Sequence, residues 1–329
     1  MGISVSAVIV AYRSGPALGR CLESLAGQAD EVVVVDNGGG EGAREGLRLV
    51  TPAENLGFAA GANLGAREAS GDVLVFLNPD TVVAAGALRA LTARLAEPTI
   101  GIAMARLRLL DRPEILNSAG TEVHVSGIGW AGGYGEPVSS LTELRDVAAP
   151  SGAAMAMRTE TFRALGGFAE ELFMYLEDLE LGWRARLAGL RVVVDPAADV
   201  YHDYEFGRHP RKSYLLERNR LVFCLTAYSG RLLFLLSPVL VATELGMVAL
   251  ALKEGWLRDK LAGWVWCLRH PRVIRRRRRA TQALREVRDR ELACFLEPVF
   301  SPGMLPVPPS LRAANPLVAR YWSLVRRAL

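Results

Sequence analysis

Four carboxylates stand at positions where they could do chemistry. Asp36 ends the apolar run 32–35, and Asp80 follows the apolar run 73–77, with Asn78 two residues before it. One or two carboxylates, together with substrate phosphates, are the usual ligands of Mg²⁺ in phosphate-handling sites. The Asn-Pro-Asp segment therefore suits a divalent cation, Mg²⁺ or Mn²⁺, that neutralises a diphosphate. The same segment also suits an ordinary turn in which Asp80 caps the next helix.

The other two carboxylates, Glu177 and Asp178, begin a segment with helical periodicity. Residues 177–188 carry apolar side chains four residues apart, and Gly189 is typical of a helix end. Carboxylates in a first helical turn lie beside the positive helix end, which favours the ionised form that a general base requires. We assign the base to Asp178. The alternative is a purely electrostatic role at the helix end, and we accept that role for Glu180.

The segment 55–65 is rich in glycine and asparagine for a helix. Each glycine inside a helix costs about 1 kcal/mol relative to alanine, so three of them need a reason such as a close approach to the backbone. Tight helix packing would be one reason. We expect instead that a ligand approaches the backbone, with Asn55 and Asn63 supplying polar contacts.

Candidate contacts at the margin of the site are His202 and a glycine-rich loop. His202 follows Asp199 near an expected strand end, where a histidine is either a metal ligand or bonded within the protein; we favour the ligand. Residues 127–135 include Trp130 and Tyr134 among several glycines. This composition predicts a mobile loop whose rings stack on a sugar, with a plain surface loop as the alternative.

The elements that must position these residues alternate between strand and helix. Apolar, β-branched runs predict strands at 5–12, 31–36, 47–50 and 73–77, and helical spacing predicts helices at 16–26, 58–69 and 86–95. Apolar strands that alternate with helices predict an α/β fold with a mostly parallel central sheet and helices on both faces. Ligands of such sheets bind at the carboxyl ends of the strands, where Tyr12, Asp36 and Asp80 fall.

Other classes of site fit this pattern less well. A dinucleotide-binding domain would use Asp36 for the ribose, but the first turn, 11–16, lacks G-x-G-x-x-G and has Pro16 where the helix would begin. An NAD-dependent oxidoreductase is therefore a distant alternative. The absence of G-x-x-x-x-G-K-[ST] excludes a P-loop NTPase. The four cysteines have no C-x-x-C spacing, which argues against a zinc site and a disulfide framework.

From residue 4 to about residue 220 the sequence carries an ordered series of motifs. They are Ala11-Tyr12, Asp36-Asn37, N-x-G-F-x-x-G-x-N at 55–63, L-N-P-D-T at 77–81, 151–158, Gly166-Gly167-Phe168, 173–175, Glu177-Asp178, 181–184 and His202. This ordered set resembles the family 2 glycosyltransferases with the GT-A fold, especially the bacterial rhamnosyltransferase-like members.

The resemblance implies roles for individual residues. Asp178 would be the catalytic base, and Asp80 and His202 would bind the metal. Donor contacts would come from Ala11, Tyr12, Asp36, Asn55, Gly57, Asn63, Asn78 and Asp80. We expect acceptor contacts at Trp130, Tyr134 and Glu177. Two residues depart from the family pattern: Asn78 replaces the first carboxylate of D-x-D, and Ala169 replaces an acidic residue, although Glu170 and Glu171 follow it.

Charge and hydropathy divide the chain unequally. Residues 1–200, here called the front of the chain, carry 16 Lys and Arg against 25 Asp and Glu. Residues 201–329, here called the rear, carry 23 Lys and Arg against 10 Asp and Glu. The rear also holds the most apolar segment, 232–252, whose 21 residues include one acid, Glu244, and Pro238. Its length approaches that of a membrane span, but a central acid and a proline disfavour spanning. We predict an amphipathic helix that lies in the membrane plane.

Aromatic and basic residues follow that apolar segment. Trp256, Trp264, Trp266 and Arg275–Arg279 are a combination typical of docking on an anionic membrane. A solvated helix face and a nucleic-acid patch are alternatives, and the absence of a nucleic-acid-binding motif argues against the second. We predict a peripheral or monotopic protein at the cytoplasmic face of the plasma membrane.

These patterns predict two regions, a GT-A glycosyltransferase domain at 1–220 and a helical, basic, membrane-associating region at 221–329. The resemblance implies an inverting enzyme that uses a dTDP- or UDP-sugar, with L-rhamnose from dTDP-L-rhamnose as its donor. The acceptor would be a polyprenyl-diphosphate-linked glycan or a polysaccharide in cell-envelope synthesis. The alternative, motivated by Asn78 and Ala169, is a non-catalytic membrane adaptor that binds nucleotide sugars.

Overall fold

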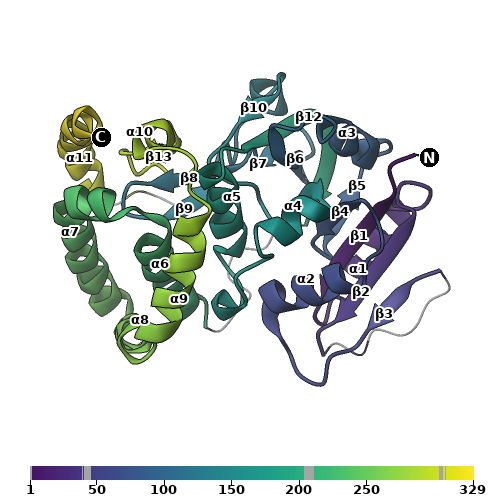
Figure 1. Cartoon of the computed structure of the whole chain (residues 1–329), viewed down its shortest axis with the longest axis horizontal. Helices are drawn as coiled ribbons and strands as arrows, with labels where there is room; N and C mark the ends of the chain where they lie inside the picture. The colour runs from purple at the N-terminus through teal and green to yellow at the C-terminus, as the bar shows by residue number, and fades with distance from the viewer. Residues whose placement is uncertain (1, 39, 41–45, 204–210, 304–306, 308) are drawn as a thin grey trace.

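The computed structural model shows a large sheet in the front of the chain and a group of helices in the rear (Figure 1). It describes residues 2–38, 40, 46–203, 211–303, 307 and 309–329. The strands are β1 (Val5–Ala11), β2 (Glu31–Asp36), β3 (Arg48–Val50), β4 (Val73–Leu77), β5 (Thr81–Val83), β6 (Ile100–Leu109), β7 (Leu116–Ser118), β8 (Thr121–His124), β9 (Gly129–Ala131), β10 (Arg145–Asp146), β11 (Ala154–Arg158), β12 (Arg191–His202) and β13 (Leu296–Glu297). The α-helices are α1 (Pro16–Ser24), α2 (Gly57–Glu68), α3 (Ala87–Arg94), α4 (Thr159–Ala164), α5 (Glu177–Leu187), α6 (Lys212–Ala227), α7 (Gly230–Glu254), α8 (Leu257–Arg269), α9 (Pro271–Ala283), α10 (Asp289–Leu292) and α11 (Pro309–Ala328).

The central sheet has the strand order β10-β12-β6-β11-β4-β1-β2-β3, with β5 paired to β12 and β7 to β6. Strand β1 lies parallel to both β2 and β4, with Ala11 opposite Asp36 and Ile9 opposite Leu77. Strand β11 runs antiparallel between β4 and β6. The predicted α/β fold with a mostly parallel sheet is therefore confirmed, and the four apolar runs are its strands.

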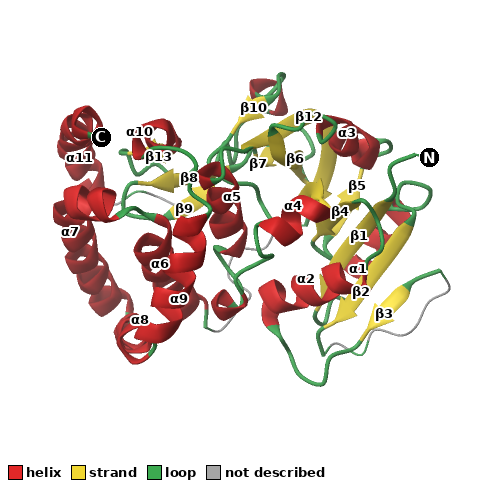
Figure 2. Ribbon diagram, in the orientation of Figure 1, coloured by secondary structure: helices red, strands yellow, loops and turns green. Residues whose placement is uncertain are grey.

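Helices cover both faces of this sheet because successive side chains of each strand point to opposite faces (Figure 2). Ala7 and Ile9 of β1 pack with α1 and α3 in one buried cluster. Val8 and Val10 pack with α2 in the other. The continuous apolar strands of the sequence thus reflect burial on two sides.

The rear of the chain is helical and packs against the front through α5. Leu179 and Trp183 of α5 share one buried cluster with Phe223 of α6 and Leu236 of α7. Arg277 of α9 donates from Nη2 to Glu180 Oε2 of α5 at 2.9 Å. The predicted boundary at residue 220 falls inside α6, so the two regions share a helix and a core.

A buried network of charges holds α6, α7 and α8 together. Glu244 of α7 pairs with Arg220 and, at 2.7 Å, with Lys260 Nζ, while Trp264 Nε1 donates to it at 2.6 Å. Lys260 also pairs with Glu217, and it has no exposed surface. Burial alone would raise the pKa of Glu244, but these partners lower it. The one acid of the apolar segment therefore faces other helices of the protein.

Candidate active site

The carboxyl ends of β1, β2 and β4 lie side by side and form the edge where the predicted donor residues meet. Asn37 N–H donates to Ala11 O at 2.8 Å, which joins the ends of β1 and β2. Asp36 is buried at this edge, whereas Tyr12 is 46% exposed beside it. A buried carboxylate next to an exposed ring is a pairing that can hydrogen-bond a nucleoside and stack on its base. The side chain of Ala11 is fully buried, so its predicted donor contact gains no support.

Asp80 and His202 meet because β5 pairs with β12, which places Thr81 opposite His202. His202 Nε2 lies 3.3 Å from Asp80 Oδ1 and 3.5 Å from Asn78 Nδ2. The other ring nitrogen, Nδ1, lies 2.9 Å from Asn117 Oδ1. An amide oxygen only accepts, so Nδ1 carries the proton and Nε2 is turned toward Asp80. This orientation by a second residue is the arrangement found behind metal-binding histidines.

The possible metal ligands at this point suit a divalent cation only if the substrate supplies further ligands. Asp80 contributes a carboxylate, Asn78 an amide and His202 an imidazole. Among the described residues, no group of three or more His, Cys, Asp or Glu side chains is gathered closely enough to hold a metal. Phosphate oxygens and water would have to complete the coordination shell, as is usual for Mg²⁺ at nucleotide sites.

Asp178 lies at the first turn of α5, and backbone amides hold both of its carboxylate oxygens. Gly152 N–H donates to Oδ2 at 2.8 Å, and Leu179 N–H donates to Oδ1 at 2.7 Å. The residue after Gly152, Ala153, accepts from Asn78 N–H at 3.0 Å. Two consecutive residues just before β11 thus connect Asp178 to the Asn78 segment.

Glu177 precedes Asp178 and is more deeply buried. It is 7% exposed, and its Oε2 has no hydrogen-bond partner within the described part of the chain. Burial raises the pKa of both carboxyls. The charge of Asp178 raises the pKa of Glu177 further. For Asp178, hydrogen bonds from backbone N–H groups oppose the rise in pKa. The pKa of Glu177 is therefore raised further than that of Asp178, so Asp178 is the carboxyl of the pair that gives up its proton more readily.

The glycines of α2 pack against protein. A Cβ on Gly57 would lie 2.5 Å from Phe173 O, and one on Gly65 would lie 2.5 Å from Val8 Cγ1. A Cβ on Gly61 would meet Val10 at 2.9 Å. Our expectation that a ligand requires these glycines was wrong; tight helix packing, the alternative, explains them.

The two predicted asparagines of this segment also bind the protein. Asn55 Oδ1 accepts from Gly57 N–H at 2.9 Å and forms the turn before α2. Asn63 is buried; it donates to Phe168 O at 3.0 Å and accepts from Phe168 N–H at 2.8 Å. These bonds fix the glycine pair at 166–167 and leave the predicted donor contact of Asn63 without support.

A family profile described as "Glycosyltransferase like family 2" matches residues 3–222. The chain belongs to this family. It is a glycosyltransferase, and its fold is GT-A.

Relatives of the glycosyltransferase include two mycobacterial enzymes. An N-acetylglucosaminyl-diphospho-decaprenol L-rhamnosyltransferase of Mycobacterium tuberculosis is 28% identical over 263 residues, which cover 68% of this chain and 84% of that protein. A pre-mycofactocin glycosyltransferase from the same species is 27% identical over 208 residues, covering 61% of this chain and 43% of that protein.

Solved structures share the fold at low identity. GalNAc-T7, crystallised with UDP, GalNAc and Mn²⁺, has a TM-score of 0.57 at 18% identity; the match covers 68% of this chain but only 48% of that one. Staphylococcus aureus TarS 1–349 in complex with UDP-GlcNAc has a TM-score of 0.52 at 16% identity, covering 99% of this chain and 91% of that one. The mannosyltransferase PcManGT from Pyrobaculum calidifontis, in complex with GDP-Man and Mn²⁺, has a TM-score of 0.50 at 18% identity, covering 100% of this chain and 87% of that one.

The predicted aromatic loop of the glycosyltransferase is an ordered strand where Trp130 lies. Trp130 is in β9, is 7% exposed, and donates from Nε1 to Glu122 at 2.7 Å. Its ring packs edge-on against Phe300 at 5.5 Å. The prediction of a mobile loop with Trp130 stacking on a sugar was therefore wrong. Tyr134, in the following turn, is half-buried, and its acceptor contact stays a prediction.

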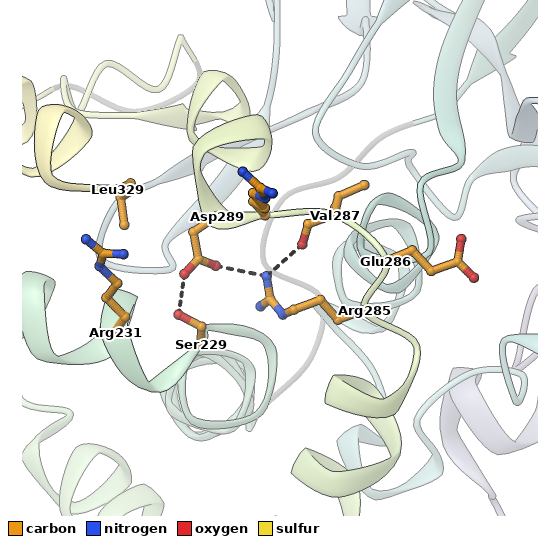
Figure 3. A pocket seen from close by; sticks show the side chains of 8 residues that line it. Ser229, Arg231, Arg285, Glu286, Val287, Asp289 and Leu329 are labelled. Atoms are coloured by element: carbon orange, nitrogen blue, oxygen red, sulfur yellow. Dashed lines mark hydrogen bonds and ion pairs between the residues drawn. The ribbon is translucent and has the colours of Figure 1, made fainter.

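A pocket in the rear of the glycosyltransferase contains none of the predicted site residues (Figure 3). Ser229, at the start of α7, bonds to Asp289, and Arg285 donates to the same carboxylate at 2.9 Å. The bond from Ser229 to Asp289 joins the start of α7 to the segment 285–289. The pocket thus marks a packed junction between rear elements.

Sequence reasoning missed two residues that shape the site. Asn37 donates to Gly57 O at 2.9 Å and accepts from Leu56 N–H at 2.8 Å, so it ties the end of β2 to the start of α2. Arg184 is buried, pairs with Glu180 at 2.7 Å and donates to Gly167 O at 2.5 Å. The four-residue spacing of Glu180 and Arg184 was visible in the sequence, but its burial was not.

Proposed function

We propose that this glycosyltransferase inverts the anomeric centre of a nucleoside diphosphate sugar, with Asp178 as the base. The observation that carries the proposal is the link from Asp178 through Gly152 and Ala153 to Asn78. This link sets the base beside the segment that would hold the diphosphate. Asp178 also retains its charge better than its buried neighbour Glu177, for the reasons given above.

The step needs one proton acceptor and one stabilised leaving group. An acceptor hydroxyl oxygen attacks the anomeric carbon from the side opposite the diphosphate, while the bond from that carbon to the diphosphate oxygen breaks. Asp178 receives the hydroxyl proton, and the diphosphate leaves with the electron pair. A divalent cation held by Asp80 and His202 would neutralise the charge on the leaving diphosphate. Tyr12 and Asp36 would bind the nucleoside.

We further propose L-rhamnose from dTDP-L-rhamnose as the donor and a polyprenyl-diphosphate-linked glycan as the acceptor. The support is the name of the mycobacterial relative, an L-rhamnosyltransferase acting on N-acetylglucosaminyl-diphospho-decaprenol, which this chain matches over 84% of its length. A polysaccharide acceptor is the second candidate for the same site.

A lipid acceptor requires a membrane-facing surface, and α7 offers one. Phe234, Val241, Leu245 and Leu252 are 58–78% exposed and recur at intervals of seven and four residues, so they lie in one stripe. Leu268 of α8 is 79% exposed. Helix α7 is long and apolar enough to cross a membrane, but Glu244 binds it to α6 and α8. We therefore propose that α7 lies in the plane of the cytoplasmic leaflet.

Exposed basic side chains lie on α9, which follows α8 in the chain. Arg272, Arg275, Arg276 and Arg279 are exposed and line one face of the helix. Arg278 instead donates to Tyr228 O at 2.8 Å, and Arg277 pairs with Glu180. Only part of the arginine run is thus available to anionic lipid, at about 1 kcal/mol for each residue near the surface.

Transfer assays with the full chain test the catalytic proposal. We expect turnover of dTDP-L-rhamnose with Mn²⁺ and the decaprenol-linked acceptor, and loss of that turnover in EDTA. We expect Asp178→Asn to lower the transfer rate at least about 1,000-fold while it still binds the donor. The control is Asp111→Asn at an exposed carboxylate. Transfer by Asp178→Asn at the normal rate would remove Asp178 from its role. Donor binding without transfer or donor hydrolysis in the unaltered chain would favour the adaptor.

Co-sedimentation with vesicles containing anionic phospholipid tests the surface. Leu245→Glu with Leu252→Glu should reduce the bound fraction strongly. Ile3→Glu with Val299→Glu adds the same charge at exposed apolar residues outside α7 and should not. Equal binding by both double variants would contradict an in-plane α7.

A further inference from the structure

The turn that leads into Glu177 and Asp178 has an unusual backbone. Phe173, Tyr175 and Leu176 have φ values of 67°, 69° and 65°. Bulky residues rarely adopt positive φ, so each instance is a strained backbone conformation. Phe173, with ψ of −65°, is the centre of a γ-turn closed by Met174 N–H donating to Leu172 O at 2.8 Å. Such a conformation persists only where surrounding contacts impose it.

One side chain supplies most of those contacts. Asn219 of α6 is fully buried, and its Nδ2 donates to Leu172 O at 3.0 Å, Met174 O at 2.9 Å and Tyr175 O at 2.7 Å. Three carbonyls of one turn therefore converge on a single amide group, and all three belong to residues at or beside the positive φ values.

A neighbouring arginine fixes the direction of that amide. Arg218 Nε donates to Asn219 Oδ1 at 2.9 Å, which turns Nδ2 toward the carbonyls. Arg218 Nη2 also donates to Leu172 O at 2.7 Å. The opposite side of the turn is held by α2, where Ala59 N–H donates to Phe173 O at 3.0 Å. The turn thus lies between α6 and the start of α2.

We propose that Asn219 is a positioning residue for the catalytic carboxylate. It imposes the strained turn, which sets where α5 begins and hence where Asp178 meets Gly152. This inference rests on the proposed role of Asp178. Displacement of a reacting group by about 1 Å costs about 100-fold in rate, so loosening the turn should act mainly on kcat.

The test replaces Asn219 by leucine, which has a similar size and no donor. We expect kcat to fall about 100-fold while the KM for the donor changes less than about threefold. Hydrogen exchange of residues 172–180 should quicken. Gln282→Leu is the matched control because Gln282 Nε2 also donates to two carbonyls of α6, Thr226 O at 2.9 Å and Ala227 O at 3.0 Å, away from the turn. The control should lower Tm and leave kcat unchanged.

The outcomes separate this inference from the proposed function. A folded Asn219→Leu with normal kcat overturns the positioning role, whatever its Tm. If Asn219→Leu does not fold, Asn219→Asp keeps the shape and the bond from Arg218 but puts an acceptor against the carbonyls; normal kcat in that variant overturns the role as well. Normal transfer by Asp178→Asn would instead refute the proposed base.

Discussion

The sheet edge in the front and the helices of the rear use charged side chains in different ways. In the front, Asp80 and Asp178 stand at the ends of strands or at a helix start, where a ligand can reach them. In the rear, Glu217, Arg220 and Lys260 are 5% exposed or less and bind one another. The basic rear predicted from composition is thus partly an internal scaffold. The difference shows that the position of a charge along an element is more informative than the number of charges.

Removal of the rear is the strongest test of whether the two regions are separable. Deleting residues 232–329 would expose Leu179 and Trp183 of α5 and remove Arg277 from Glu180. We expect the shortened chain to lose cooperative unfolding and to aggregate, as judged by circular dichroism and gel filtration. A soluble remainder with a sharp thermal transition would support the predicted division at residue 220.

Lys260→Met tests the scaffold role of the rear charges. It leaves Glu217 and Glu244 short of a partner in a buried place, and breaking a buried pair in this way costs about 3–5 kcal/mol of unfolding free energy. Urea unfolding measures the change, with Lys253→Met, at an exposed position on α7, as the control. A loss below about 1 kcal/mol would mean that the network is not structural.

Asp80→Asn tests the chemical role of a charge in the front. Loss of this carboxylate should reduce kcat/KM by at least about 100-fold and weaken the apparent affinity for Mn²⁺, with little change in Tm. Asp203→Asn, next to His202 and paired with Arg20 at the surface, serves as the control. An unchanged Mn²⁺ titration would contradict metal binding at Asp80.

Glu177→Gln tests how pH acts on the front. The pKa of Glu177 is raised by burial, so the folded state loses stability as pH rises from the ordinary carboxyl range, about 4, through the raised value. Glutamine removes this loss. We expect Tm to rise by a few degrees at about pH 8 and to match the unaltered chain at about pH 3, where the carboxyl is protonated in both the folded and the unfolded state. An equal gain at both pH values would show that charge is not the cause.

Most of the fold in the front followed from local pattern. Strands such as 31–36 and 73–77 are buried on both faces, so their composition alone marks them, and their carboxyl ends fix where Asp36 and Asp80 lie. The start of α5 at Glu177 was also predictable because carboxylates gather in its first turn.

The contacts that decide individual roles were not visible locally. The partner of Gly57 is Phe173, and the partner of Asn63 is Phe168, 105 residues away. Nothing near residues 55–65 distinguishes such a partner from a ligand. In the same way, the glycines around Trp130 are typical of a loop, but Phe300, far along the chain, packs against its ring.

The pairing of β5 with β12 has a consequence for how the protein matures. Asn78 and His202 are 124 residues apart in sequence, and Asp178 is held by Gly152, which lies between them in the chain. Contacts of such long range close late in folding because the chain entropy lost in closing them must be overcome first. Catalytic activity should therefore be the last property that a refolding chain recovers. The recovery of turnover during refolding would then report when the central sheet is complete.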